Sequence, residues 1–193
     1  MSFHEASSAL FRVAAGNLDL FCLLGLICGL ATSLMPHRRF ILLSSAVCSL
    51  CFSVHFLRLG SATGMAMNLI GVTQCLLAVR FVTERGRPAW LGAAFTLTFL
   101  LAAGLTLSTW SGWPSAFAGI GTLVSTAARL QTSPQNMRGL LIGSALCWAA
   151  HNLIVGSVCG LTCDVLTLSG FAIVFARSGL NMRSSSFAPS PAR

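Results

Sequence analysis

Two histidines, an aspartate and an asparagine lie inside stretches that are otherwise apolar. His55 and Asn68 precede His151 and Asp164 by the same interval of 96 residues. Ionisable groups at membrane depth usually face the interior of a helical bundle, where they bind solutes or transfer protons. Trp148 comes three residues before His151 and offers an aromatic face for stacking on a sugar or another flat ligand. We therefore predict a substrate-binding site made of Asn68, Asp164, His55, His151 and Trp148.

A structural interpretation of these residues stands beside the functional one. A helical hairpin brings each histidine to the depth of the polar residue that follows it. A His55–Asn68 or His151–Asp164 hydrogen bond would then tie two helices together, and Trp148 would fill space. Small polar residues on the same helix face are also typical of close packing between membrane helices. They form one stripe on each of two helices: Ser44, Cys48 and Cys51, and Ser144 and Cys147.

No arrangement in the sequence is typical of an enzyme, a metal site or a cofactor site. A Ser-His-Asp grouping, a phosphate loop and an H-E-x-x-H motif are all absent. Cys48-x2-Cys51 is a lone pair without a second ligand pair at zinc spacing. Cys159 and Cys163 lie near the outer face and are the candidates for oxidation. Three cysteines are interpreted as small buried hydrophobic residues: Cys22, Cys28 and Cys75.

The composition is that of a membrane protein. Of the 193 residues, 55% are hydrophobic and only 8% are charged, whereas soluble domains carry about 25% charged residues. A mean hydropathy of +0.81 excludes a disordered or nucleic-acid-binding chain. A helix needs about 20 apolar residues to cross a bilayer. Seven apolar stretches therefore predict an all-α membrane protein with seven transmembrane helices: 18–35, 40–57, 64–82, 89–108, 116–130, 139–155 and 161–176.

The arginines predict the orientation of the chain. If the helices alternate in direction, all basic residues except Arg12 and Arg58 fall on one side of the membrane. Basic loops stay in the cytoplasm. We therefore place the N-terminus outside and the C-terminus inside, in a bacterial inner membrane. The basic rim then contacts anionic lipid headgroups rather than nucleic acid. The expected partners are the lipid bilayer and a small-molecule substrate, with the oligomeric state left open.

An internal repeat organises the apolar stretches into two units of three helices. The repeat rests on two fifteen-residue runs with seven identical positions: Leu50-Cys51-x3-His55-x-Leu57-x2-Gly60-Ser61-x2-Gly64 and Leu146-Cys147-x3-His151-x-Leu153-x2-Gly156-Ser157-x2-Gly160. An extra helix between the units lets both run in the same direction, a 3+1+3 plan of parallel repeats. The predicted parts are an N-terminal arm (1–17), a first repeat (18–82), a linker helix with its loops (83–115), a second repeat (116–177) and a disordered cytoplasmic tail (178–193).

Five short motifs spread over residues 20–177 point to a known family. They are Arg38-Arg39-Phe40, Val54-His55-Phe56-Leu57-x-Leu59-Gly60, Ile120-Gly121-Thr122-x-Val124-Ser125-Thr126, Cys147-Trp148-x2-His151-Asn152 and Gly156-Ser157. Together they resemble the YgjV family of bacterial inner-membrane proteins. The resemblance implies a location in the inner membrane, and it implies no particular activity because the family has none assigned. The plan also resembles the SWEET and PQ-loop transporters. It departs from them because Ser133-Pro134-Gln135 lies at a loop and the intramembrane prolines of the SWEET type are missing.

These observations predict a carrier of a sugar-like or other small polar solute that works by alternating access. A partly polar lining with one acid favours a neutral or cationic solute, with a proton carried on Asp164 as a further option. The alternative is a membrane protein without transport activity that binds a partner or lipid through its basic cytoplasmic face. A polar cavity that reaches the membrane midplane between the repeats would favour the carrier.

Overall fold

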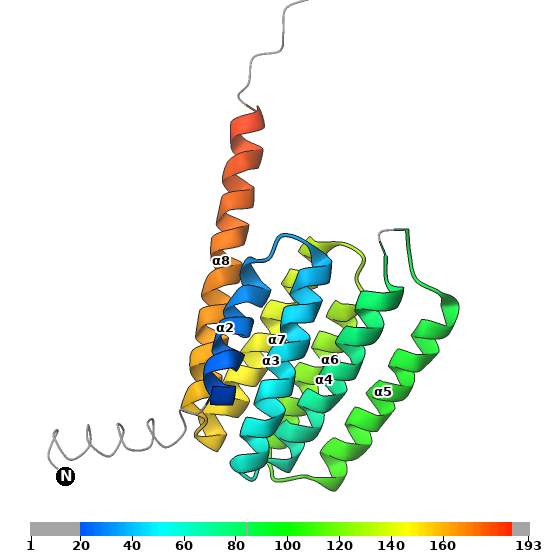
Figure 1. The fold of residues 1–193 in the computed structure, drawn as a ribbon, viewed down its shortest axis with the longest axis vertical. Coiled ribbons are helices and arrows are strands. Elements are labelled where there is room, and N and C mark those ends of the chain that lie inside the picture. Colours follow the sequence, from blue (N-terminus) through cyan, green and yellow to red (C-terminus); the bar gives the residue numbers. More distant parts are fainter. Residues whose placement is uncertain (1–19, 84, 187–193) are drawn as a thin grey trace, which may run out of the picture.

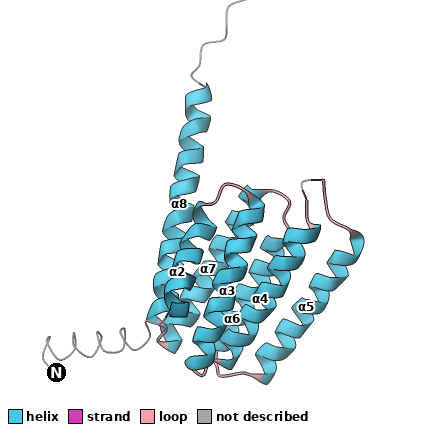
Figure 2. Cartoon of the chain, viewed as in Figure 1, coloured by secondary structure: helices cyan, strands magenta, loops and turns pink. Residues whose placement is uncertain are grey.

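Seven α-helices joined by loops make up the part of the chain that the structure describes, residues 20–83 and 85–186 of a computed structural model (Figure 1). In chain order they are α2 (Leu20–Leu34), α3 (Arg38–Arg58), α4 (Ala62–Phe81), α5 (Ala89–Ser108), α6 (Trp113–Arg129), α7 (Pro134–Val155) and α8 (Val158–Ser186). These residues form no strand (Figure 2). Their one β-type pairing is an isolated bridge between Thr83 and Gly86. The predicted all-α class is confirmed.

Prolines and glycines set the helix boundaries. Pro88 precedes the first residue of α5, and α6 and α7 each carry a proline in the first turn, where the missing backbone N–H costs nothing. For this reason α7 begins at Pro134, earlier than the expected residue 139. Gly156 ends α7 with a φ of 72°, a left-handed conformation that favours glycine.

Five of the described helices are long and apolar enough to cross a membrane. They are α3, α4, α5, α7 and the first part of α8, Val158–Arg177. The apolar helix α2 has 15 residues, and α6 has 17 residues with a buried polar face. Trp90, Trp110 and Trp113 are exposed at helix ends, which is where aromatic side chains meet a membrane–water interface.

Six helices form a closed ring, and α5 lies outside it. Around the ring, α2 packs against α3, α3 against α4, α4 against α6, α6 against α7, α7 against α8, and α8 against α2. Helix α5 packs against α4 and α6 at the edge of the bundle (Figure 1). The first and last described helices therefore lie side by side, and α8 then continues beyond the bundle (Figure 1).

The last helix is longer than the sequence predicts. Helix α8 runs on to Ser186, whereas the sequence predicts a disordered tail from residue 178. The polar segment 178–186 contains no proline, and Pro189 is the first residue that would stop a helix. The predicted arm (1–17) and residues 187–193 lie outside the described residues.

Candidate functional site

A cavity of about 130 Å³ lies inside the six-helix ring. Three of the five predicted site residues line it: Asn68, Trp148 and Asp164. None of the lining residues belongs to α5. The polar lining comes from all six ring helices: Thr32 from α2, Ser49 from α3, Asn68 from α4, Arg129 from α6, Ser144 and Asn152 from α7, and Asp164 from α8.

Asp164 and Asn152 form an acceptor-rich end of the cavity. The Asn152 Nδ2 atom donates a hydrogen bond of 2.7 Å to Asp164 Oδ2 and so joins α7 to α8. Among the described residues, no donor pairs with the second oxygen of Asp164. The Oδ1 atom of the buried Asn152 is likewise without a partner there. The Asp164 carboxylate therefore keeps one oxygen without a protein donor, whereas the Asn152 Oδ1 atom is buried against Gly160.

Arg129 brings a second charge to the same cavity. It is the last residue of α6 and is only 6% exposed. Its Nη1 atom donates to Gln74 Oε1 (2.6 Å) and Ser125 Oγ (2.9 Å), and its Nε atom donates to Cys75 Sγ (3.1 Å). The Nη2 atom donates to nothing in the described part of the chain and lies so close to Gly71 that a Cβ there would be 3.2 Å away. No carboxylate of the described residues lies within 4.0 Å of the guanidinium, so this cation lacks a counter-ion there.

Aromatic rings close one side of the cavity. The rings of Phe56 and Trp148 stack at a centroid distance of 5.9 Å and an interplanar angle of 26°. The Trp148 indole packs over Gly121, where an added Cβ would lie 3.0 Å from the ring. Phe52, which also lines the cavity, packs over Gly25 in the same way, with a corresponding distance of 2.8 Å.

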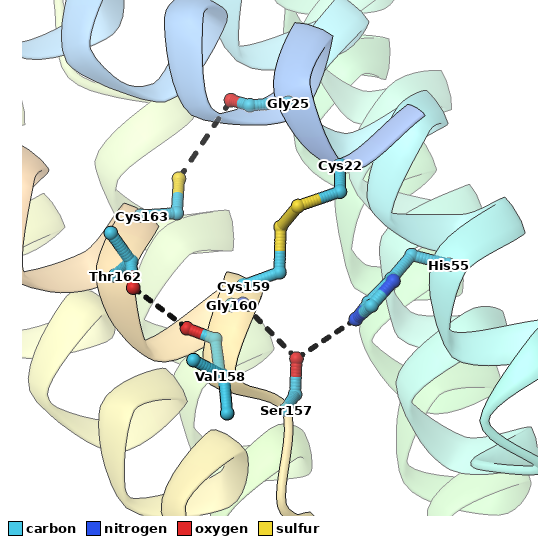
Figure 3. The surroundings of a disulfide bond; sticks show 9 residues. All are labelled: Cys22, Gly25, His55, Ser157, Val158, Cys159, Gly160, Thr162 and Cys163. Atoms are coloured by element: carbon cyan, nitrogen blue, oxygen red, sulfur yellow. Dashed lines mark hydrogen bonds between the residues drawn. A yellow bond between two sulfur atoms is a disulfide. The ribbon is translucent and has the colours of Figure 1, made fainter. Parts of the chain in front are cut away.

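The two histidines do not line the cavity, contrary to the sequence prediction. His151 is buried, and its Nδ1 atom donates to Pro114 O at 2.9 Å. His55 Nε2 lies 3.0 Å from Ser157 Oγ, at the start of α8 (Figure 3). The helix ends pack so tightly that each ring finds a partner on a helix outside its own hairpin. Asn68 instead donates to Gly64 O of its own helix, and neither His–Asn nor His–Asp pair forms within a hairpin.

A disulfide between Cys22 and Cys159 joins the first turns of α2 and α8, with a Cα–Cα distance of 6.1 Å (Figure 3). The interpretation of Cys22 as a plain hydrophobic residue is therefore wrong. Of the two cysteines predicted as candidates for oxidation, Cys159 is paired and Cys163 is free. The Cys163 thiol points toward the Gly25 carbonyl at 3.8 Å. The pairing follows from the packing of α2 against α8, which brings together two residues 137 positions apart.

Sequence reasoning missed two residues of the site, Arg129 and Asn152. In the sequence, Arg129 contributes only to the charge asymmetry that predicts the orientation of the chain. Nothing in its spacing shows that the side chain points into the bundle. Asn152 belongs to the motif Cys147-Trp148-x2-His151-Asn152, which pointed to a family but not to a site. The signal for Asn152 was its polarity beside an intramembrane histidine.

The fold and the cavity define a multi-pass helical membrane protein with a polar interior. The sequence profile of the Imp-YgjV family, described as a bacterial inner membrane protein, matches residues 18–181, and the chain therefore belongs to this family. It is 29% identical to the inner membrane protein YgjV of Escherichia coli (strain K12) over 131 residues, which is 67% of each chain. No solved structure matches the chain. The predicted family and inner-membrane location are confirmed.

Proposed function

We propose that this protein carries a small polar solute across the bacterial inner membrane by alternating access. The supporting observation is a partly polar cavity lined by all six ring helices, which receives Asn68 from one half of the chain and Asp164 from the other. A protein that only bound partners through its basic rim would need no such cavity. Polar groups inside a membrane protein are costly and mark solute pathways.

The proposal includes a seven-helix crossing built from two repeats, α2–α4 and α6–α8, with α5 as the linker. Helix α2 contacts α8, and α4 contacts α6. The first helix of each unit thus contacts the third helix of the other, as expected of two units related by a pseudo-two-fold axis. Close contacts to glycine recur at the interval of 96 residues. The matching pairs are Gly25–Phe52 with Gly121–Trp148, and Gly64–Phe56 with Gly160–Asn152.

Two arginines support the same relation between the repeats. Near the start of α3, Arg38 donates to the carbonyls of Arg129 (2.7 Å) and Gln131 (2.8 Å) at the end of α6. Near the start of α7, Arg138 donates to the carbonyl of Met35 (2.6 Å) after the end of α2. Each arginine thus binds the C-terminal end of the first helix of the other unit, where a cation is favoured by the helix dipole.

We further propose that the N-terminus lies outside the cell. The disulfide lies at the end of the bundle that the arginine distribution assigns to the periplasm, and disulfides form and persist in that oxidising compartment. Arg38, Arg80, Arg85 and Arg87 lie at the opposite end, where α3 begins and α4 meets α5. Two independent features, thiol oxidation and charge, therefore support one orientation.

The test is uptake by proteoliposomes of a panel of small sugars, amines, carboxylates and amino acids. We compare Ala145→Phe, which fills a buried position in the cavity wall, with Leu146→Phe at the next position, which is 57% exposed on the outside of the bundle. Uptake should fall to the level of empty liposomes with Ala145→Phe and stay near wild type with Leu146→Phe. Absence of uptake for every solute, or equal uptake by both variants, contradicts a carrier that works through this cavity.

Alternating access makes a second demand on the same cavity. In a variant that keeps only Cys22 and Cys159, a single cysteine replaces the half-buried Ser49 in the cavity wall. We expect impermeant thiol reagents to label this position from either side of the membrane, and a transported solute to slow labelling from both. Labelling from one side alone, whatever solute is present, argues against alternation.

A further inference from the structure

We infer that the solute is a small zwitterion, with a carboxylate bound by Arg129 and an ammonium group bound by Asp164. This inference rests on the proposed carrier function and names the class of its substrate. It starts from one juxtaposition, a cation and an acid that line the same cavity without pairing with each other or with any other ionic group of the described residues.

Charge balance narrows the choice of ligand. Charged side chains inside membrane proteins usually pair with one another, because an isolated charge in a poorly solvated site is costly. A ligand with only a carboxylate would neutralise Arg129 and leave the charge of Asp164 unpaired. A ligand with only an amine would neutralise Asp164 and leave the charge of Arg129 unpaired. A neutral sugar would leave both charges. A ligand that carries both groups neutralises both ends in one binding event.

The free hydrogen-bonding groups at each end match this ligand. Three donor contacts fix the Nε and Nη1 side of Arg129 and leave its Nη2 atom unused, and a guanidinium binds a carboxylate through such N–H groups. At the other end, the second oxygen of Asp164 has no protein donor among the described residues, and an ammonium group has only donors to offer.

The two ends also lie at neighbouring depths. Asp164 and its counterpart Asn68 are each six residues into their helices, and Gly71, which touches the Arg129 guanidinium, is three residues further along α4. At 1.5 Å per residue this is an offset of about 4.5 Å along the helix axis. An α-amino acid with a hydrogen bond at each charged group is long enough to span this offset along the axis.

The volume of the cavity limits the side chain. A cavity of about 150 Å³ in another protein holds one benzene molecule, with its six carbon atoms, and the cavity here measures about 130 Å³. Glycine and alanine, with five and six non-hydrogen atoms, fit this space, whereas a disaccharide or a large amino acid does not. We therefore assign the site to small amino acids.

The test is calorimetric titration of the purified full-length protein with L-alanine, propionate, ethylamine and glucose. Propionate and ethylamine each keep one of the two charges of alanine. We expect alanine to bind at least about 30-fold more tightly than either, because each of them leaves a buried charge unpaired. Asp164→Asn should weaken alanine binding by a similar factor and strengthen propionate binding, because propionate no longer leaves an unpaired acid in the cavity. Ser169→Ala, at an exposed position of the same helix, should change neither.

Several results would overturn the zwitterion site. They are binding of ethylamine or glucose as tightly as alanine, or alanine binding that Asp164→Asn does not change. If Asp164→Asn does not fold, the ligand series on the wild-type protein decides alone. The carrier proposal is judged separately by uptake: transport of a sugar or amine without alanine binding refutes the zwitterion and keeps the carrier. Alanine binding without uptake of any solute keeps the site and refutes the carrier.

Discussion

The indole of Trp148 lies directly over Gly121, in a space that a single methyl group on the glycine would invade. A Cβ at Gly121 would stand 3.0 Å from the indole Cδ1 atom and 3.2 Å from Cys147 Cβ. This contact joins α7 to α6 and holds the indole against Phe56 at the cavity wall. Trp148 lies in the middle of α7 rather than at a helix end, so it does not belong to an aromatic belt at the membrane interface. Its position is instead fixed by packing against a glycine on the neighbouring helix.

Replacement of Gly121 by alanine should destabilise the protein by about 1–3 kcal/mol, because the indole and the helix must move apart. The matched control is Gly104→Ala in α5, where an added Cβ meets no atom within 4 Å. Alanine in a helix is favoured over glycine by about 0.5–1 kcal/mol, so this control should be neutral or slightly stabilising. Thermal unfolding in detergent measures both, and equal midpoints would show that the contact with Trp148 is not tight.

Arg38 should be intolerant even of lysine. Besides its bonds to α6, its Nη1 atom donates to the carbonyls of Ala78 (3.2 Å) and Val82 (3.0 Å) at the end of α4. A lysine keeps the charge but cannot reproduce the planar fork of donors. We expect Arg38→Lys to cost about 2 kcal/mol of stability. Arg39→Lys, at the exposed neighbouring position, should stay within about 0.5 kcal/mol of wild type, and the same loss in both variants would argue against the role of the fork.

The thiol count should reveal the disulfide. Of the eight cysteines, two form the Cys22–Cys159 bond and six take part in no disulfide. Unfolded but unreduced protein should therefore take up six alkylating groups by mass spectrometry, and reduced protein eight. Cys159→Ala should lower stability by about 2–4 kcal/mol through loss of the cross-link, whereas Cys147→Ala should not alter the number of thiols gained on reduction. Eight reactive thiols before reduction would rule out the bond.

The orientation is tested by two single cysteines in a variant that keeps only the disulfide pair. S111C lies in the loop between α5 and α6, and T132C lies in the loop between α6 and α7, both at exposed positions. An impermeant maleimide added to intact spheroplasts should label S111C at once. T132C should react only after the membrane is opened. Labelling of both from outside would contradict the seven-helix crossing.

The helices were predictable because the features that define them are local. Hydropathy marked seven apolar stretches, and each coincides with one described helix. Turn residues such as Gly156 and Pro88 fall at the boundaries. The error at the end of α8 has a local cause as well, because polarity predicts disorder only weakly where no proline interrupts the helix.

The site was only partly predictable because its partners come from distant helices. The interval of 96 residues drew attention to Asn68 and Asp164, and both line the cavity. It could not show that His55 and His151 would bind Ser157 and Pro114 instead. Nor could it show the direction of the Arg129 side chain. An arginine at a helix end can extend toward the lipid headgroups or into the bundle, and its position in the sequence does not distinguish the two.

The bond between Cys22 and Cys159 also changes the covalent topology of the molecule. Backbone and disulfide together enclose residues 22–159 in one macrocycle, from which the two ends of the chain leave as tails. The exposed loop at Arg85 lies within this macrocycle, between α4 and α5. A protease that cuts there opens the ring without releasing a fragment, so the cleaved protein gains only the mass of one water molecule until a reductant separates the halves.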